Sequence, residues 1–121
     1  MIETFDRALH GERVDGWYRA RGMEPPAAEM LSAVGVVNEC AAGWLYLTGT
    51  AVALVDGVIA APGAPSEAID EVIEALTAVA RASGARVLLG YTQRTGVLAC
   101  AARLGWERDG KPYHLVTKGL R

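Results

Sequence analysis

Residues 58–76, VIAAPGAPSEAIDEVIEAL, combine features that could bind an anion. An apolar, strand-like run meets the corner PGAP at 62–65, and a helical pattern follows it. The first N–H groups of a helix have no partner within the helix, and small neighbouring side chains leave them accessible to a negatively charged ligand. The stretch therefore predicts either an anion site at the start of this helix or only a stiff turn between a strand and a helix.

The cysteines and histidines do not form a recognisable nucleophile or metal site. Cys40 and Cys100 are the only cysteines, without a CxxC pair, and His10 and His114 lie far apart in the chain. Cys100 falls in an alanine-rich helical segment with no evident histidine partner, so we expect a small packing residue rather than a nucleophile. We expect no metal site, and reduced thiols.

Three short strands are expected before residue 61. Apolar and β-branched runs over 33–39, 44–48 and 51–60 are separated by a turn at 40–43 and a corner at 49–50, which predicts an antiparallel meander. Upstream of the meander, apolar residues at helical spacing predict one or two helices between Ile2 and Gly22, with a break near Gly11.

The remaining chain alternates between helix and strand. We expect a helix from near Ser66 to Ser83-Gly84, a short buried strand over 86–91, a helix over 95–104, and a final hairpin formed by 106–108 and 113–118. A strand–helix–strand unit implies that 86–91 lies parallel to the strand that ends at Ala60.

Together these elements predict an α/β protein with a mixed, mostly antiparallel sheet and helices on both faces. The 121 residues should form one domain, with N-terminal helices over 1–32 and the core over 33–120.

Composition argues against several classes of protein. The net charge is −2 and no block of five like charges occurs, so we expect no nucleic acid or membrane partner. Residues 41–55 carry no charge, but glycine and β-branched residues fill them, which favours two strands over a membrane span. The N-terminus is charged and lacks a secretory apolar region, so a cytoplasmic protein is expected.

The order of these elements, with PxxPSEA opening the central helix and AARLGW closing the next, resembles the GNAT superfamily of N-acetyltransferases. The likeness covers about residues 33–120. It implies the acyl-CoA N-acyltransferase fold, acetyl-CoA as cosubstrate, and transfer of the acetyl group to a primary amine by direct attack on the thioester.

The resemblance also implies where the cofactor lies. In that superfamily the pantetheine arm pairs with the central strand, and the pyrophosphate lies on the N-terminus of the helix after it. In this sequence Pro65 stands where the superfamily has a basic residue, and Ala101 where it often has a general-acid tyrosine. On this chain the implied cofactor residues are Val58, Ala60, Ala64, Ser66, Glu67 and Ala68.

Three further side chains gain a role from the resemblance. Asp56 would accept the proton of the amine, Tyr91 would protonate the leaving thiolate, and Arg94 would face a CoA phosphate. Each also has a plain structural interpretation: a strand-edge aspartate that faces solvent or pairs with an arginine, a buried core tyrosine, and a solvated arginine. Glu39 is a second candidate base.

Two functions stay open. The first is an N-acetyltransferase that acts on a small-molecule or protein-borne amine. The second is a catalytically degenerate GNAT-fold protein that serves as a binding or interaction module, which the two departures from the superfamily pattern favour. The acceptor amine cannot be read from the residues, and a homodimer is left open.

Overall fold

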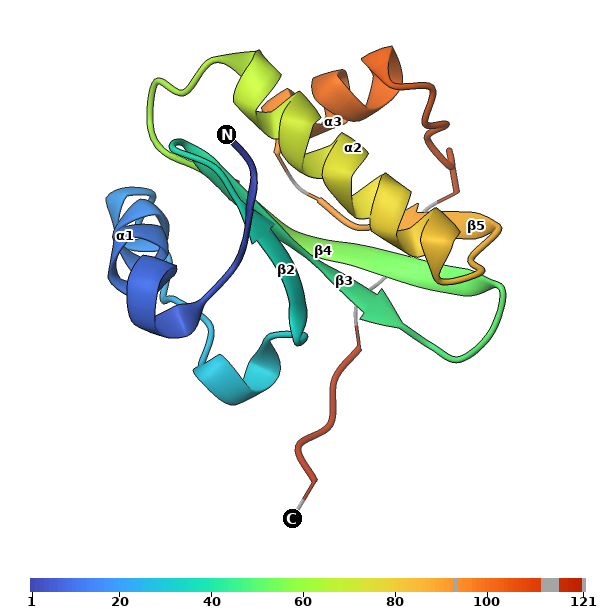
Figure 1. Cartoon of the computed structure of the whole chain (residues 1–121), viewed down its shortest axis with the longest axis horizontal. Helices are drawn as coiled ribbons and strands as arrows, with labels where there is room; N and C mark the ends of the chain where they lie inside the picture. Colours follow the sequence, from blue (N-terminus) through green and yellow to red (C-terminus); the bar gives the residue numbers. More distant parts are fainter. Residues whose placement is uncertain (93, 112–115, 121) are drawn as a thin grey trace.

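The computed structural model describes residues 1–92, 94–111 and 116–120 (Figure 1). Its elements, in chain order, are β1 (Glu3–Thr4), α1 (Arg7–Ala20), the short 3-10 helix η1 (Ala28–Met30), β2 (Val34–Val37), β3 (Ala41–Leu47), β4 (Val52–Ala60), α2 (Ser66–Ala82), β5 (Val87–Gly90) and α3 (Thr95–Arg103). No helix among these residues is long and apolar enough to cross a bilayer.

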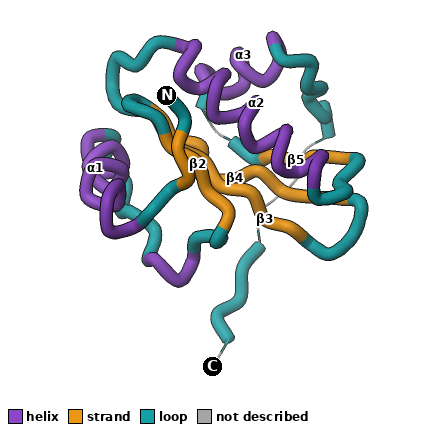
Figure 2. The backbone as a smooth tube through the Cα atoms, viewed as in Figure 1, coloured by secondary structure: helices purple, strands orange, loops and turns teal. Residues whose placement is uncertain are grey.

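The strands form one sheet in the order β1-β2-β3-β4-β5 (Figure 2). The pairs from β1 to β4 are antiparallel, and β5 lies parallel to β4, with Val52 opposite Val87 and Val55 opposite Gly90. The expected mixed, mostly antiparallel sheet is therefore confirmed, as is the parallel pair on either side of α2.

Helices cover both faces of the sheet, as expected. Figure 1 shows α1 on one face and α2 with α3 on the other. The apolar stripe of α2 buries Val72 and Leu76 against Leu45 and Val55 of the sheet. On the opposite face Val14 and Trp17 of α1 pack in one cluster with Trp44, which is completely buried. Burial of these two stripes fixes which face each helix covers.

A β-bulge interrupts the pairing of β3 with β4. Ala42 lies opposite Ile59 and Trp44 opposite Asp56, so that two residues of β4 face Gly43 alone. One of these two residues, Gly57, has φ of +70°, a conformation that side chains disfavour. A Cβ at Gly57 would also lie 3.0 Å from Cε3 of Trp44. The bulge thus depends on a glycine at this position.

The expected break of the first helix near Gly11 is wrong. Helix α1 runs without interruption through Gly11, because Asp6 caps its start by accepting the N–H of Ala8 and because its buried face supplies the stability that glycine lacks. Gly11 also makes room for Arg7, whose side chain would collide with a Cβ there. The N-terminal region therefore holds one α-helix, the 3-10 helix and the unpredicted strand β1.

The turn expected at 40–43 lies earlier. Asn38 is buried, and its Oδ1 accepts the N–H groups of Cys40 and Ala41 at 2.9 and 2.8 Å, which closes the turn before Ala41. Residues 41–43 already belong to β3. Gly43 reads as a turn residue, but it lies beneath α2, where a Cβ would be 2.9 Å from Cγ1 of Val72.

Two expectations for the C-terminal third are also wrong. Strand β5 is not buried: Val87 and Leu89 are 49% and 43% exposed, because the described part of the chain places no strand beyond β5. Residues 106–108 and 116–118 are not strands, so the described residues hold no final hairpin; residues 113–115 of that expectation lie outside them.

Candidate functional site

Strands β4 and β5 part in the middle of β4. Their pairing ends at Val55 and Gly90, whereas β4 continues to Ala60 and the chain after Gly90 turns toward α3. The N–H of Ala61 donates to the carbonyl oxygen of Cys40 beside β3, so that Val58 and Ala60 direct their own backbone groups to the opposite edge. There the carbonyl oxygen of Ala60 accepts Nε of Arg21, which leaves the N–H of Ala60 and the groups of Val58. This open edge could pair with the amide groups of an extended ligand.

A cavity of about 330 Å³ lies beyond this parting, at the C-terminal end of β4. It is enclosed by the end of α1, the end of β4, the first turns of α2 and the start of α3. Its lining residues are Arg21, Ala60, Ile69, Arg94, Thr95, Gly96 and Val97. Residues from four elements thus meet at one place.

The start of α2 has small, accessible residues beside this cavity. No side chain caps the helix start, and Ser66 and Glu67 are exposed. The buried Asn38 fixes this turn, since its Nδ2 donates to the carbonyl oxygen of Ala68 and to Oε1 of Glu71, both at 2.9 Å. The N–H groups of Ala64 and Ala68 already donate to the carbonyl oxygens of Ala61 and Pro65, which leaves those of Ser66 and Glu67 for an anion.

Two of the four acidic residues in the first turns of α2 are engaged elsewhere. Asp70 accepts Nη2 of Arg103 at 2.8 Å, and this bond is the main reason that its pKa is lowered. Glu71 accepts the amide of Asn38, as above. The charge of Asp70 is partly offset by Arg103, which reduces the repulsion toward an anion that the sequence suggests.

Helix α1 contributes two side chains to β4 that the sequence interpretation missed. The hydroxyl of Tyr18 donates to the carbonyl oxygen of Gly57 at 3.2 Å, and Nε of Arg21 donates to that of Ala60 at 3.0 Å. The pKa of Tyr18 is raised to about 12, mainly by burial. The charge of Arg94 lowers this pKa and the charge of Asp56 raises it, each by a smaller amount. Their i, i+3 spacing on one helix face was the available signal.

Asp56 lies beside the bulge, on the face of the sheet that α1 covers in part. Its side chain is exposed, and its charge contributes to the raised pKa of both Tyr18 and Tyr46, for which burial is the main cause. No arginine pairs with Asp56 in the described residues. The carboxylate is accessible to a ligand next to two phenols, an arrangement that could accept a proton from an amine.

The other predicted acid–base residues are Tyr91 and Glu39. Tyr91 follows β5 and is 70% exposed, so its interpretation as a buried core tyrosine is wrong. Glu39 lies in the turn before β3 and accepts the amino group of Met1 at 2.7 Å, the bond that chiefly lowers its pKa. Glu39 therefore has a partner of its own, whereas Tyr91 remains accessible.

Arg94 lines the cavity and is not a fully solvated arginine. It is half-buried at the N-cap of α3, and its Nη2 lies 3.1 Å from Sδ of Met23. Burial is the main cause that lowers its pKa, and the nearby charge of Arg21 lowers it further. Two guanidinium groups thus lie close together in this cavity.

Cys100 is a packing residue, as expected. It is 1% exposed, its thiol lies 3.7 Å from the carbonyl oxygen of Ser66, and burial is the main cause of its raised pKa. Such a thiol is a poor nucleophile. Within the described residues there is also no cluster of three or more histidine, cysteine, aspartate or glutamate side chains that could hold a metal.

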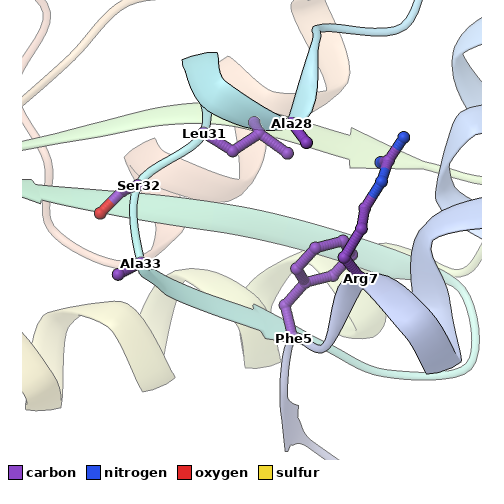
Figure 3. A pocket seen from close by; sticks show the side chains of 6 residues that line it. All are labelled: Phe5, Arg7, Ala28, Leu31, Ser32 and Ala33. Atoms are coloured by element: carbon purple, nitrogen blue, oxygen red, sulfur yellow. The ribbon is translucent and has the colours of Figure 1, made fainter.

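A second cavity, of about 240 Å³, lies between β1, α1 and η1 (Figure 3). Phe5 and Arg7 line one side of it, and Leu31 with Ala28 lies across from them. The guanidinium of Arg7 is already paired with Asp15, at 2.8 and 3.1 Å. The second cavity therefore offers fewer unpaired polar groups than the first.

Comparison with known proteins shows what this architecture resembles. No family model and no curated protein matches the sequence. Among solved structures, a mutant form of a Thermus thermophilus protein has a TM-score of 0.74 at 16% identity, covering 100% of this chain and 99% of that one. An acetyltransferase from Trypanosoma brucei has a TM-score of 0.68 at 12% identity, covering 97% and 99%. An aminoglycoside N-acetyltransferase in complex with CoA has a TM-score of 0.70 at 14% identity, covering 98% and 100%. At these identities the likeness shows the fold, and the expected fold is confirmed.

Proposed function

We propose, since this chain has the GNAT fold, that it is an N-acetyltransferase that transfers the acetyl group of acetyl-CoA to a primary amine. The parting of β4 from β5 carries the proposal. It brings together the edge of β4 at Val58 and the N–H of Ala60, a cavity, and the exposed start of α2; the carbonyl oxygen of Ala60 is already bonded to Arg21.

This arrangement supports a specific position for the cofactor. The pantetheine arm would pair with β4 from Val58 to Ala60, and the pyrophosphate would lie on the backbone of Ala64 to Ala68, next to Ser66 and Glu67. A helix start carries about half a positive charge, which favours the pyrophosphate there. Arg94 would add positive charge toward a CoA phosphate.

The transfer itself would need little covalent participation by the protein. The amine nitrogen bonds to the thioester carbon, the carbon–sulfur bond breaks, and the thiolate of CoA takes up a proton. Asp56 would accept the proton of the amine, and Tyr91 or water would return one to CoA. Holding the neutral amine near the thioester supplies much of the rate, and Cys100 takes no part.

Titration calorimetry with acetyl-CoA tests the binding. Ser66→Glu should weaken acetyl-CoA affinity about tenfold or more, because it adds a negative charge and bulk beside the pyrophosphate. Ser83→Glu, which makes the same change at the exposed opposite end of α2, is the matched control and should bind like the unaltered protein.

Three results would count against the proposal in different ways. Unchanged affinity of Ser66→Glu would place the cofactor elsewhere, and no binding by the unaltered protein would overturn the function. The transfer assay uses a panel of amines that includes an aminoglycoside, because one structurally similar protein is an aminoglycoside N-acetyltransferase. Binding of acetyl-CoA without transfer to any of these amines would favour the alternative of a binding module.

A further inference from the structure

We propose that Arg21 and Arg94 together form an anion subsite, which takes a carboxylate or phosphate group of the ligand that occupies the cavity at the C-terminal end of β4. The inference deepens the proposed function, on which the nature of the ligand rests. It assigns Arg21, at the C-terminal end of α1, a role in binding that the sequence does not suggest.

The two guanidinium groups are close together and lack a counter-charge. Burial is the main cause that lowers the pKa of Arg94, and the nearby charge of Arg21 contributes to it. Within residues 1–92, 94–111 and 116–120, neither forms an ion pair. Arg21 donates to a backbone carbonyl, and Arg94 meets only a thioether sulfur, which is a weak acceptor.

Two other arginines in the described structure are paired with carboxylates. Arg7 pairs with Asp15 at 2.8 Å beside the second cavity (Figure 3), and Arg103 pairs with Asp70 at 2.8 Å. Among the described residues, the lining of the first cavity contains no acidic side chain. Arg94 is half-buried whereas Arg21 is exposed, and neither has a carboxylate partner among the described residues, so an anionic ligand in the cavity would supply the missing counter-charge.

The surroundings of the pair favour an oxyanion. Arg94 is the N-cap of α3, where no side chain caps the first N–H groups, and the positive end of this helix points to the same place. A Cβ at Gly96 would meet nothing within 4 Å, so there is room for a ligand group. Guanidinium groups bind carboxylate and phosphate oxygens in pairs of charge-assisted hydrogen bonds.

Two sources could supply such a group. One source is CoA, a phosphate of which would reach Arg94 as proposed above and Arg21 beside it. The other is an amino-acid-like acceptor, whose carboxylate would take the pair if only the uncharged pantetheine arm lies along Ala60.

Arg21→Gln and Arg94→Gln test the subsite, with Arg19→Gln as the control. Arg19 is exposed on the same helix as Arg21 and does not line the cavity, so its change removes the same charge. Circular dichroism first establishes that each variant folds. If Arg21→Gln does not fold, Arg94→Gln alone tests the subsite, because it removes only the contact with the sulfur of Met23. Thermal unfolding is then measured with inorganic pyrophosphate and with citrate, at constant ionic strength.

We expect at least one of these anions to raise the melting temperature of the unaltered protein and of Arg19→Gln more than that of the two cavity variants. An equal rise in all four proteins would overturn the subsite. The melting-temperature measurement with these anions does not require CoA binding, so it tests the subsite separately from the proposed function. Failure of the proposed function would appear as no binding of CoA or pantetheine by the unaltered protein.

Two further measurements identify the source. If a CoA phosphate is bound, both cavity variants lose about tenfold or more in affinity for CoA but not for pantetheine, which has no phosphate. If an acceptor carboxylate is bound, the unaltered protein acetylates an amino acid in preference to its carboxamide, and the variants lose that preference about tenfold. Absence of both effects would overturn the proposal.

Discussion

Replacing Gly57 by alanine should destabilise the protein by about 2–5 kcal/mol. The left-handed conformation at φ +70° costs a non-glycine residue about 1–2 kcal/mol. The new Cβ would lie 3.0 Å from Cε3 of Trp44, which is completely buried and cannot retreat, because Gly35 lies against its indole nitrogen. Overpacking of this kind adds about 1–3 kcal/mol. Urea unfolding followed by circular dichroism measures the change, with little change expected in the slope against urea.

Two other glycines separate the two causes. Gly63→Ala meets nothing within 4 Å but also has a positive φ, +78°, so it should cost only the backbone contribution of about 1–2 kcal/mol. Gly96→Ala lies in α3 without a positive φ and without a neighbour within 4 Å, so it should be neutral or stabilise by up to about 1 kcal/mol. A loss at Gly57 no larger than that at Gly63 would refute the contact with Trp44 as a cause, and a neutral Gly63→Ala would refute the backbone cause.

Three further predictions concern the site. Asp56→Asn should lower the rate of acetyl transfer about 10²-fold or more while acetyl-CoA affinity is kept, and an unchanged rate would contradict its role as the base. Cys100→Ala should keep most of the transfer activity; a folded variant without any activity would overturn direct attack by the amine. Between the ordinary tyrosine pKa near 10 and the pKa of about 12 for Tyr18, unfolding releases a proton, so stability should fall as pH rises, by up to about 2–3 kcal/mol. Tyr18→Phe should flatten this alkaline decline in urea unfolding at pH 9 to 12, and equal declines in both proteins would disprove the assignment.

The elements that bury a periodic stripe could be predicted from the sequence. Apolar residues at helical spacing identify α2, and the β-branched run over 52–60 identifies β4. The parallel position of β5 follows from the handedness of the connection through α2. These features depend on local pattern and general geometry, so one sequence is sufficient to find them.

Features that depend on close approach between distant segments could not be predicted. Gly43 and Gly57 read as a turn residue and a plain strand residue, and their roles arise from α2 and Trp44. Arg94 was a candidate on its own, but its neighbour Arg21 is brought to it only by the way α1 lies along β4. The sequence signals spacing along each element, whereas the cavity is made by the contact of four elements.

The burial of Trp44 has a consequence for how motion at the bulge can be observed. Its indole N–H has no hydrogen-bond acceptor among the described residues, and the ring is shielded between Gly35 and Gly57. Water reaches that proton only when the sheet opens locally, so its exchange with deuterium in NMR spectra reports the opening of the bulge rather than the breaking of a hydrogen bond. The dry surroundings should also shift the fluorescence of this ring to shorter wavelength. Trp44 is thus a built-in probe next to Asp56, and it can follow a ligand's effect on the strand without any added label.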